Sequence, residues 1–159
     1  MTSTEPSTHQ GLLSRWKEVL TTTNPPSSGE MDVVSRWLFL TRAAVLPMTV
    51  TAGLVAGLLA VHAEDFNAGW FALAFLGIIL AHTANNLMND LFDSTTGLDT
   101  ADYPRAMYSP HPVLEGYITK RGLATAAILV NLVDAAVGIA LFMARGWPVI
   151  AFALAGFLL

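Results

Sequence analysis

Three long apolar stretches constrain the fold of this chain more than any other feature of its sequence. Trp37–Val61 carries Arg42 as its one charge, Phe66–Asn89 carries no Asp, Glu, Lys or Arg, and Gly122–Ala144 carries Asp134 alone. A helix needs about 20 residues to cross the hydrocarbon layer. Lipid offers no partner to the backbone, so each crossing segment must be hydrogen-bonded internally. The sequence therefore predicts an all-α fold, a multi-span transmembrane helix bundle.

The composition agrees with a membrane-embedded chain and excludes several other classes of protein. Charged residues make up 13% of the sequence, against about 25% in an ordinary soluble domain. The net charge of −4 and the scattered Lys and Arg residues provide no basic surface for nucleic acid. The absence of Cys excludes disulfides and thiolate metal sites. We therefore expect membrane lipids, and no nucleic acid, among the partners of this chain.

A fourth apolar stretch, Trp147–Leu159, is too short to cross the membrane. Its 13 residues would form a helix of roughly 20 Å, whereas the hydrocarbon layer is about 30 Å thick. The stretch ends without a polar flank. We therefore expect three full spans and a partial fourth, with the chain ending inside a helix as the first half of a larger bundle. The alternative is a short re-entrant or interfacial tail.

Residues 1–35 differ from the rest of the chain and predict a tail outside the membrane. They are rich in Ser, Thr and Pro, and the segment GLLSRWKEVL predicts an amphipathic helix in the membrane interface. Residues 36–159 then form the transmembrane domain. Most Lys and Arg residues lie before or early in the first span, or between the second and third spans. The positive-inside rule predicts a multi-pass protein of the cell membrane with a cytoplasmic N-terminus and a cytoplasmic loop at 93–121.

A stripe of polar side chains lies at the end of the second apolar stretch. His82, Asn86, Asn89, Asp90 and Asp93 fall at offsets of 0, 4, 7, 8 and 11 residues, which places them on one face of a helix. Lipid cannot solvate such a face, so we expect this stripe to line the bundle interior or a wet cavity. The alternative is a plain helix end whose polar residues lie among the lipid headgroups.

The oxygen atoms of this stripe favour a hard cation such as Mg²⁺. In proteins Mg²⁺ commonly takes one or two carboxylates and fills its other positions with water and substrate phosphate oxygens. The loop DSTTGLD fails the calcium-binding EF-hand pattern, and the lack of Cys argues against zinc. The stripe therefore predicts a Mg²⁺ site that receives a phosphate-bearing substrate at the membrane surface.

The residues in and around the stripe resemble the UbiA superfamily of intramembrane prenyltransferases. NNLMNDLFD, followed by GLDTADYPRA, is similar to the first aspartate-rich motif of that family. TRAAVLP in the first span resembles the opening of the branch that prenylates 1,4-dihydroxy-2-naphthoate. The resemblance runs from about Arg36 to the end of the chain. It implies Mg²⁺-dependent transfer of a polyprenyl group from a polyprenyl diphosphate to an aromatic or other lipophilic acceptor, as in quinone and isoprenoid biosynthesis.

The resemblance also assigns roles to single residues. The implied catalytic carboxylates are Asp90 and Asp93. The implied metal ligands are Asn89, Asp90, Asp93 and Asp99. The implied diphosphate contacts are Asn86, Arg105 and Arg42. Arg42 has an alternative role, because a long basic side chain near the end of a span can extend to the membrane surface. His111 departs from the family pattern, since many members have Arg at this position, which puts its role in diphosphate binding in doubt.

A non-enzymatic protein is the alternative function. In that case the chain is an ion-binding or transporter-like membrane protein fragment, and the polar stripe coordinates a translocated cation. The enzyme interpretation requires a second aspartate-rich motif, which this sequence does not contain. The resemblance therefore also predicts that the 159-residue chain alone carries out no transfer.

Other residues have structural interpretations beside functional ones. Gly53 and Gly57 indicate close helix packing, and Pro47 indicates a kink in the first span. We expect His82 to be a hydrogen-bonded structural residue. Asp134 lies in the middle of the third span. It is either part of a site or a carboxyl group that is protonated or paired.

Overall fold

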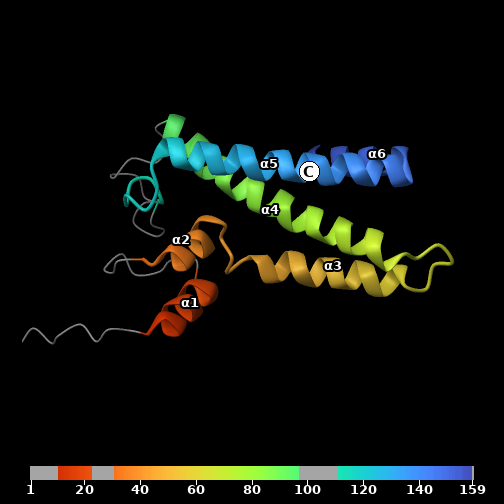
Figure 1. The fold of residues 1–159 in the computed structure, drawn as a ribbon, viewed down its shortest axis with the longest axis horizontal. Coiled ribbons are helices and arrows are strands. Elements are labelled where there is room, and N and C mark those ends of the chain that lie inside the picture. The colour runs from red at the N-terminus through yellow and green to blue at the C-terminus, as the bar shows by residue number, and fades with distance from the viewer. Residues whose placement is uncertain (1–10, 23–30, 97–110, 159) are drawn as a thin grey trace, which may run out of the picture.

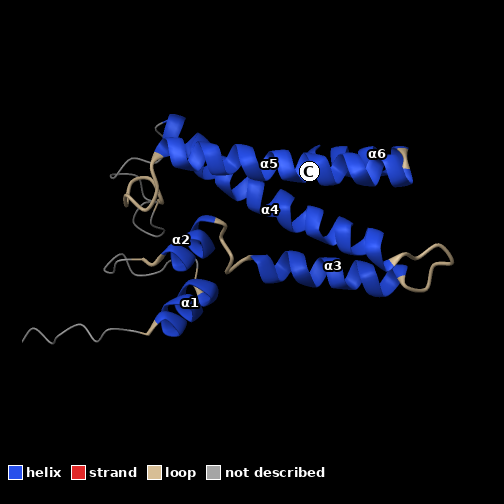
Figure 2. Cartoon of the chain, viewed as in Figure 1, coloured by secondary structure: helices blue, strands red, loops and turns tan. Residues whose placement is uncertain are grey.

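The computed structural model describes residues 11–22, 31–96 and 111–158, and every regular element in these ranges is a helix. Figure 1 shows their arrangement, and Figure 2 shows the helices with the described loops and turns between them. The elements are α1 Leu12–Thr21, α2 Val33–Leu40, α3 Leu46–Ala60, α4 Ala68–Thr96, α5 Lys120–Arg145 and α6 Trp147–Leu158. The predicted all-α class is confirmed for the described part of the chain.

The predicted first span is broken into two helices, so the expectation of one continuous helix over Trp37–Val61 is wrong. Helix α2 ends at Leu40, and α3 begins at Leu46. Arg42 between them has a φ of 51°, in the left-handed region that interrupts a helix. Pro47 lies in the first turn of α3, where its missing N–H leaves no helical hydrogen bond unmade. The predicted kink is therefore a full break, and it lies before Pro47.

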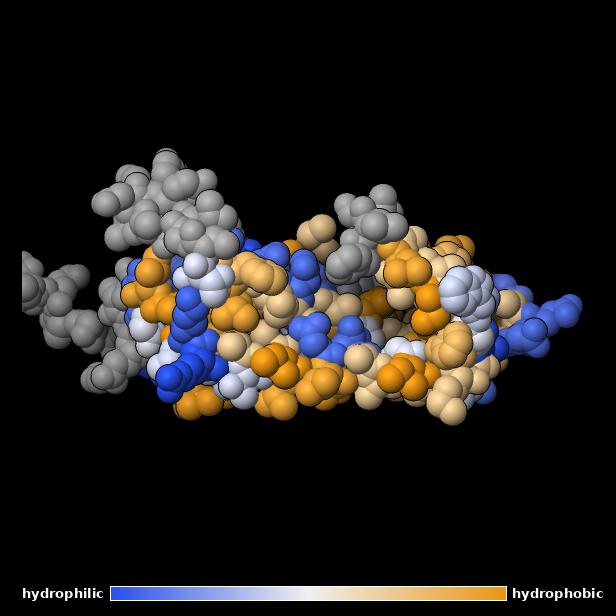
Figure 3. All heavy atoms as spheres, turned by 90° about the horizontal axis from the view of Figure 1, so that it is seen from above, coloured by the Kyte–Doolittle hydropathy of each residue, from blue (hydrophilic) through white to orange (hydrophobic). Residues whose placement is uncertain are grey.

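Helices α4 and α5 have the length and composition of membrane spans, as predicted for the second and third stretches. They contain 29 and 26 residues, and each is apolar enough to cross a membrane. Only 17% and 11% of their most apolar windows are buried within the protein, whereas a soluble core helix is mostly buried. Figure 3 shows apolar side chains spread along one face of the molecule. A surrounding apolar phase would remove this surface from water. Helices α3 and α6 are shorter apolar helices.

The best packed region lies where α2, the end of α4 and the start of α5 meet. Leu40, Leu87 and Leu123 are fully buried there, together with Ala126 and Ala127. Figure 1 shows the end of α4 beside the start of α5 and a growing separation of the two helices toward their other ends. This cluster fixes the end of α4 that carries the polar stripe.

Close packing between α3 and α4 depends on two glycines, as predicted. A Cβ atom on Gly53 would lie 2.2 Å from Cε2 of Phe75, and one on Gly57 would lie 2.5 Å from Cζ of Phe71. The two Phe rings are stacked, with centroids 6.0 Å apart. An added methyl group at either glycine would therefore require one of these rings to shift.

We predict that Gly53→Ala lowers the free energy of unfolding by about 1–3 kcal/mol, because the added methyl group overpacks against Phe75. Gly138→Ala is the matched control, since a Cβ atom on Gly138 meets nothing within 4 Å. There the better helix propensity of Ala should be neutral or stabilising by up to about 1 kcal/mol. Unfolding in mixed micelles would measure both; equal effects of the two substitutions would contradict the proposed contact.

The fourth stretch forms a helix that folds back along α5. Gly146 separates α5 from α6 with a φ of 73°, a conformation that favours glycine. Its N–H donates to the Phe142 carbonyl over 2.7 Å and closes the last turn of α5. Figure 1 shows α6 returning beside α5 from this turn. The 12 residues of α6 agree with the predicted short helix.

The predicted amphipathic helix in the N-terminal tail is present as α1, and it packs on α2. Val19 is buried, and Trp16 Nε1 donates a hydrogen bond of 3.2 Å to Asp32 Oδ1. Leu12 and Leu13 are 56% and 76% exposed. The helix therefore keeps an apolar surface that is free to enter a membrane interface, which remains a prediction.

Asp32 links α1 to α2 and should give this contact an acid-sensitive stability. Its carboxylate accepts hydrogen bonds from the Ser35 hydroxyl, the Ser35 and Val34 amides and the Trp16 indole. The Ser35 hydrogen bonds lower the pKa of Asp32 from 3.8 to about 2. The contribution of Asp32 is therefore complete above pH 3.8 and is lost as the pH falls through about 2.

We expect hydrogen exchange at the Val34 and Ser35 amides to accelerate as the pH falls from 4 to 2, beyond the intrinsic change in exchange rate. Asp32→Asn keeps an oxygen that can cap α2 but has no charge to lose. Exchange in that variant should show no such acceleration. An identical pH response in wild type and Asp32→Asn would rule out the carboxylate as its cause.

Candidate functional site

The polar stripe at the end of α4 is partly inside the protein. Asp90 is 3% exposed and Asn86 is 9% exposed, and the fully buried Leu87 lies between them in sequence. A buried carboxylate is stable only with a compensating charge or hydrogen bonds. The packing of α4 against α2 and α5 therefore requires polar partners at this position.

Arg42 supplies the charge that Asp90 requires. Its Nη2 lies 2.5 Å from Oδ1 of Asp90, and the two side chains are 33% and 4% exposed. The break between α2 and α3 places Arg42 at this position, and its left-handed φ of 51° is uncommon for a residue with a side chain. The sequence analysis proposed both residues for one site, and the structure joins them across 48 positions of the chain.

Two further contacts fix the surroundings of this pair. Asn86 Nδ2 donates to the Thr41 carbonyl over 3.3 Å, which ties α4 to the turn that carries Arg42. His111 is 6% exposed, and its Nε2 lies 3.1 Å from the backbone carbonyl of Asp90. The Val113 amide donates to His111 Nδ1 over 3.2 Å. Nδ1 is thus an acceptor, so Nε2 carries the proton that is donated to Asp90.

His111 is therefore a structural residue that sequence analysis did not identify. Its two ring nitrogens hold the chain that follows the loop against the end of α4. The sequence indicated only that His111 stands where many family members have a phosphate-binding Arg. No local signal predicted its structural role, because its contact is with Asp90, 21 positions away in the chain.

His82 lies deeper on the same face of α4 and has the structural role predicted for it. Its Nδ1 lies 2.8 Å from the Thr49 hydroxyl, which links α4 to α3. Its Nε2 is one of three buried side-chain polar atoms without a hydrogen-bond partner in the part of the chain that the structure describes. His82 therefore joins two helices near the Arg42–Asp90 pair.

The rest of the stripe does not join Arg42 and Asp90 in one metal cluster. Asn89 is exposed and lines a cavity of about 1320 Å³ between α4, α5 and α6, and Asp93 is half-buried. The described lining of that cavity includes neither Asp90 nor Asp93. Within residues 11–22, 31–96 and 111–158, no three His, Cys, Asp or Glu side chains form a group that could hold a metal ion. The proposed residues Asp99 and Arg105 lie outside the described residues.

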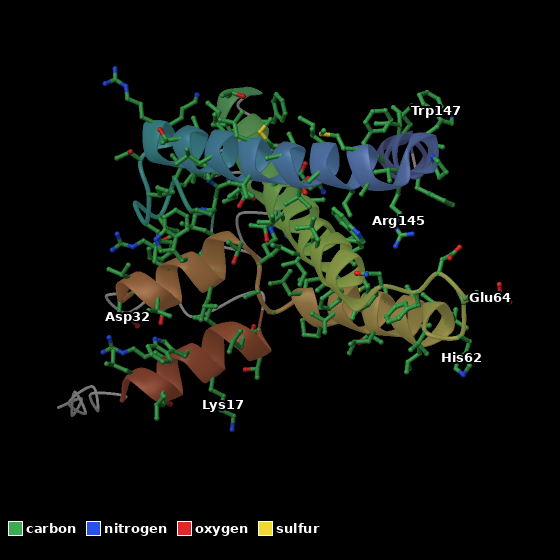
Figure 4. The ribbon with its side chains drawn as sticks, turned by 45° about the vertical axis from the view of Figure 1, so that its right-hand side comes forward. Lys17, Asp32, His62, Glu64, Arg145 and Trp147 are labelled. Carbon is green, nitrogen blue, oxygen red and sulfur yellow. The ribbon has the colours of Figure 1, made fainter. Side chains whose placement is uncertain are left out.

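The end of the molecule that carries the stripe is also rich in basic residues. Lys120 Nζ donates to the Ser94 carbonyl over 3.3 Å and so neutralises part of the negative end of α4. Figure 4 shows Lys17 at this end, and Arg145 with Glu64 and His62 at the opposite end. The cytoplasmic orientation of this end remains a prediction.

No known family model, curated protein or solved structure matches the chain. The resemblance to the UbiA superfamily therefore rests on the motifs quoted above and on what the structure does with their residues. Arg42, Asn86 and Asp90 lie together, Asn89 faces the cavity, and Asp93 lies between these two surfaces on α4.

Proposed function

We propose that this chain belongs to a Mg²⁺-dependent intramembrane transferase of the UbiA type. The enzyme would move a polyprenyl group from a polyprenyl diphosphate to an aromatic or other lipophilic acceptor. The observation that carries the proposal is the contact between Arg42 and Asp90 at 2.5 Å. The resemblance names both residues, and they meet at the basic end of two helices long enough to cross a membrane.

The chemistry of the donor set supports a Mg²⁺ site at the end of α4. Asp90 and Asp93 are carboxylates one helical turn apart, and Asn89, on the adjoining cavity side of α4, adds an amide oxygen. These are hard oxygen ligands of the kind that Mg²⁺ takes. We propose that they hold the ion together with Asp99. When bound, Mg²⁺ would offset the charge that develops on the departing diphosphate.

Arg42 would have two roles in this proposal. In the structure it compensates the charge of Asp90. A guanidinium group can also donate two parallel hydrogen bonds to a phosphate. Since the Arg42 side chain is 33% exposed, part of it can face a diphosphate while it remains beside Asp90. The apolar walls of the nearby cavity would accept the polyprenyl chain and keep water away from it.

We also propose the location and orientation of the protein. Helices α4 and α5 would span the cell membrane, with α3 and α6 beside them as parts of a multi-pass protein. The basic end, which carries α1, α2 and the end of α4, would face the cytoplasm.

Binding of farnesyl diphosphate to the 159-residue chain in lipid nanodiscs tests the proposal. We expect saturable binding that requires Mg²⁺ and is lost in excess EDTA. Farnesol, which has the same chain without the diphosphate, should show no dependence on Mg²⁺. If the two ligands respond equally to Mg²⁺, the proposed function is wrong. Mg²⁺ binding that farnesyl diphosphate leaves unchanged would favour the ion-binding alternative.

A further inference from the structure

The cavity between α4, α5 and α6 has the character of a ligand site. Its volume is about 1320 Å³, which exceeds what a single ion or water cluster requires. Aromatic side chains line it from two helices, namely Trp70 and Phe71 near the start of α4, Phe92 near its end, and Phe152 on α6. Such walls suit an apolar molecule with a flat or extended body.

Five polar side chains interrupt these apolar walls along the two longest helices. Asn85 and Asn89 are one turn apart on α4, Asn131 and Asp134 are one turn apart on α5, and Arg145 ends α5. Asp65 and Asn67 also line the cavity, from the connection between α3 and α4. Asn131 Nδ2 donates to the Ala127 carbonyl over 2.8 Å, which fixes that side chain along its own helix. The cavity therefore has a polar strip on two facing helices, with Asp134 as its only carboxylate on α5.

Asp134 lies at mid-depth, beside a glycine of the facing helix. A Cβ atom on Gly77 of α4 would lie 3.8 Å from Oδ1 of Asp134 and 3.2 Å from Cγ1 of Val137. Gly77 therefore leaves room for the Asp134 carboxyl group between the helices. Across the described residues, Asp134 has neither a hydrogen-bond partner nor an ion pair. A carboxyl group without a partner in the middle of a membrane span is unfavourable unless a ligand or water satisfies it.

We propose that this cavity binds an uncharged, apolar molecule that carries a hydroxyl group, and that Asp134 accepts the hydrogen bond of that hydroxyl. The aromatic walls contact the apolar body, and Asn131 lies one turn away to contact a second polar atom. The evidence for this binding site is the lining of the cavity, and it is independent of the proposed prenyl transfer. If the transfer proposal also holds, the ligand of this site is the acceptor.

The lining of the cavity favours a hydroxylated apolar ligand over a cation. A bare cation needs several oxygen ligands within a small space, whereas the mainly aromatic and aliphatic side chains here line a partly open volume far larger than an ion. A plain acyl chain would fill the apolar part but would leave Asp134 unsatisfied. A hydroxyl-bearing molecule satisfies both parts of the lining.

Paired probes test the proposal directly. We would measure binding of 1-naphthol and of 1-methoxynaphthalene to the 159-residue chain in nanodiscs, with partitioning into empty nanodiscs subtracted. The two probes share an aromatic body, but only 1-naphthol can donate a hydrogen bond. We expect wild type to bind 1-naphthol at least tenfold more tightly. Equal affinities for the two probes would contradict the proposal.

Substitutions then assign the preference to Asp134. Asp134→Ala and Asp134→Leu should remove the preference for 1-naphthol and leave 1-methoxynaphthalene affinity within twofold. Val133→Leu, at an exposed neighbour outside the cavity lining, should change neither affinity. A preference that survives in Asp134→Ala, which adds no bulk, overturns the proposal. So does an equal loss of both probes in that variant, because the carboxyl group would then have no hydroxyl-specific role.

The two proposals fail in different ways. Loss of Mg²⁺-dependent farnesyl diphosphate binding with an intact 1-naphthol preference would refute the transferase proposal and leave this site standing. Loss of the 1-naphthol preference with intact Mg²⁺-dependent farnesyl diphosphate binding would refute the hydroxyl site alone.

Discussion

Arg42→Gln is expected to lower the free energy of unfolding by about 1–3 kcal/mol, because it removes the ion pair with a buried carboxylate. Asp90 is 3% exposed, so water has little access to the position that the guanidinium group leaves. The Arg42 side chain is 33% exposed, and this exposure reduces the expected effect below that of a fully buried pair. Unfolding in mixed micelles, with residual helix content followed by circular dichroism, would measure the change.

A double-mutant cycle separates this pair from general effects of either substitution. Asp90→Asn removes the charge that needs compensation, so Arg42→Gln should cost less in that background, with a coupling of about 1–2 kcal/mol. Arg121→Gln removes an exposed positive charge at the same end of the molecule and should change stability by less than about 0.5 kcal/mol. If the effects of Arg42→Gln and Asp90→Asn simply add, the contact contributes nothing to the fold.

Asp90→Asn and Asp93→Asn are each expected to weaken Mg²⁺-dependent binding of farnesyl diphosphate at least about tenfold, or about 1.4 kcal/mol of binding free energy. Each substitution replaces an anionic oxygen with a neutral amide and so reduces the attraction for a divalent ion. Affinity measured in nanodiscs at fixed Mg²⁺ would show the change.

Glu64→Gln provides the matched control for these two variants. It removes an exposed carboxylate from the connection between α3 and α4, at the opposite end of α4 and outside the cavity lining. The affinity of this variant for farnesyl diphosphate should equal that of wild type. A comparable loss in Glu64→Gln would mean that overall negative charge, and not a local metal site, controls binding.

The long helices were predictable from the sequence because their signal is local. Apolar runs with few charges define α4 and α5, and the predicted limits Phe66 and Gly122 lie within two residues of their observed starts, Ala68 and Lys120. Glycine spacing likewise predicted close helix packing at Gly53 and Gly57, and the structure identifies α4 as the partner helix. In each case the feature could be predicted from the residues of the helix itself.

The break at Arg42 and the division of the polar stripe were not predictable in this way. The left-handed conformation of Arg42 goes together with a contact to Asp90, a residue 48 positions away. Helical offsets placed Asn89 and Asp90 on one face, yet adjacent residues differ by about 100° around a helix. Asp90 therefore meets Arg42, whereas Asn89 reaches the cavity beside α5. Only the positions of the neighbouring helices decide such an outcome.

Reciprocal binding of metal and diphosphate tests the central claim most directly. If one ion at Asp90 and Asp93 holds the diphosphate, Mn²⁺ used in place of Mg²⁺ must raise farnesyl diphosphate affinity by the same factor by which farnesyl diphosphate raises Mn²⁺ affinity. We would measure both factors on the chain in nanodiscs, with the Mn²⁺–diphosphate complex in empty nanodiscs subtracted. We predict equal factors of at least about ten, or about 1.4 kcal/mol, in wild type, and factors of one in Asp90→Asn/Asp93→Asn. A factor of one in wild type, or an unchanged factor in the double variant, would contradict the account.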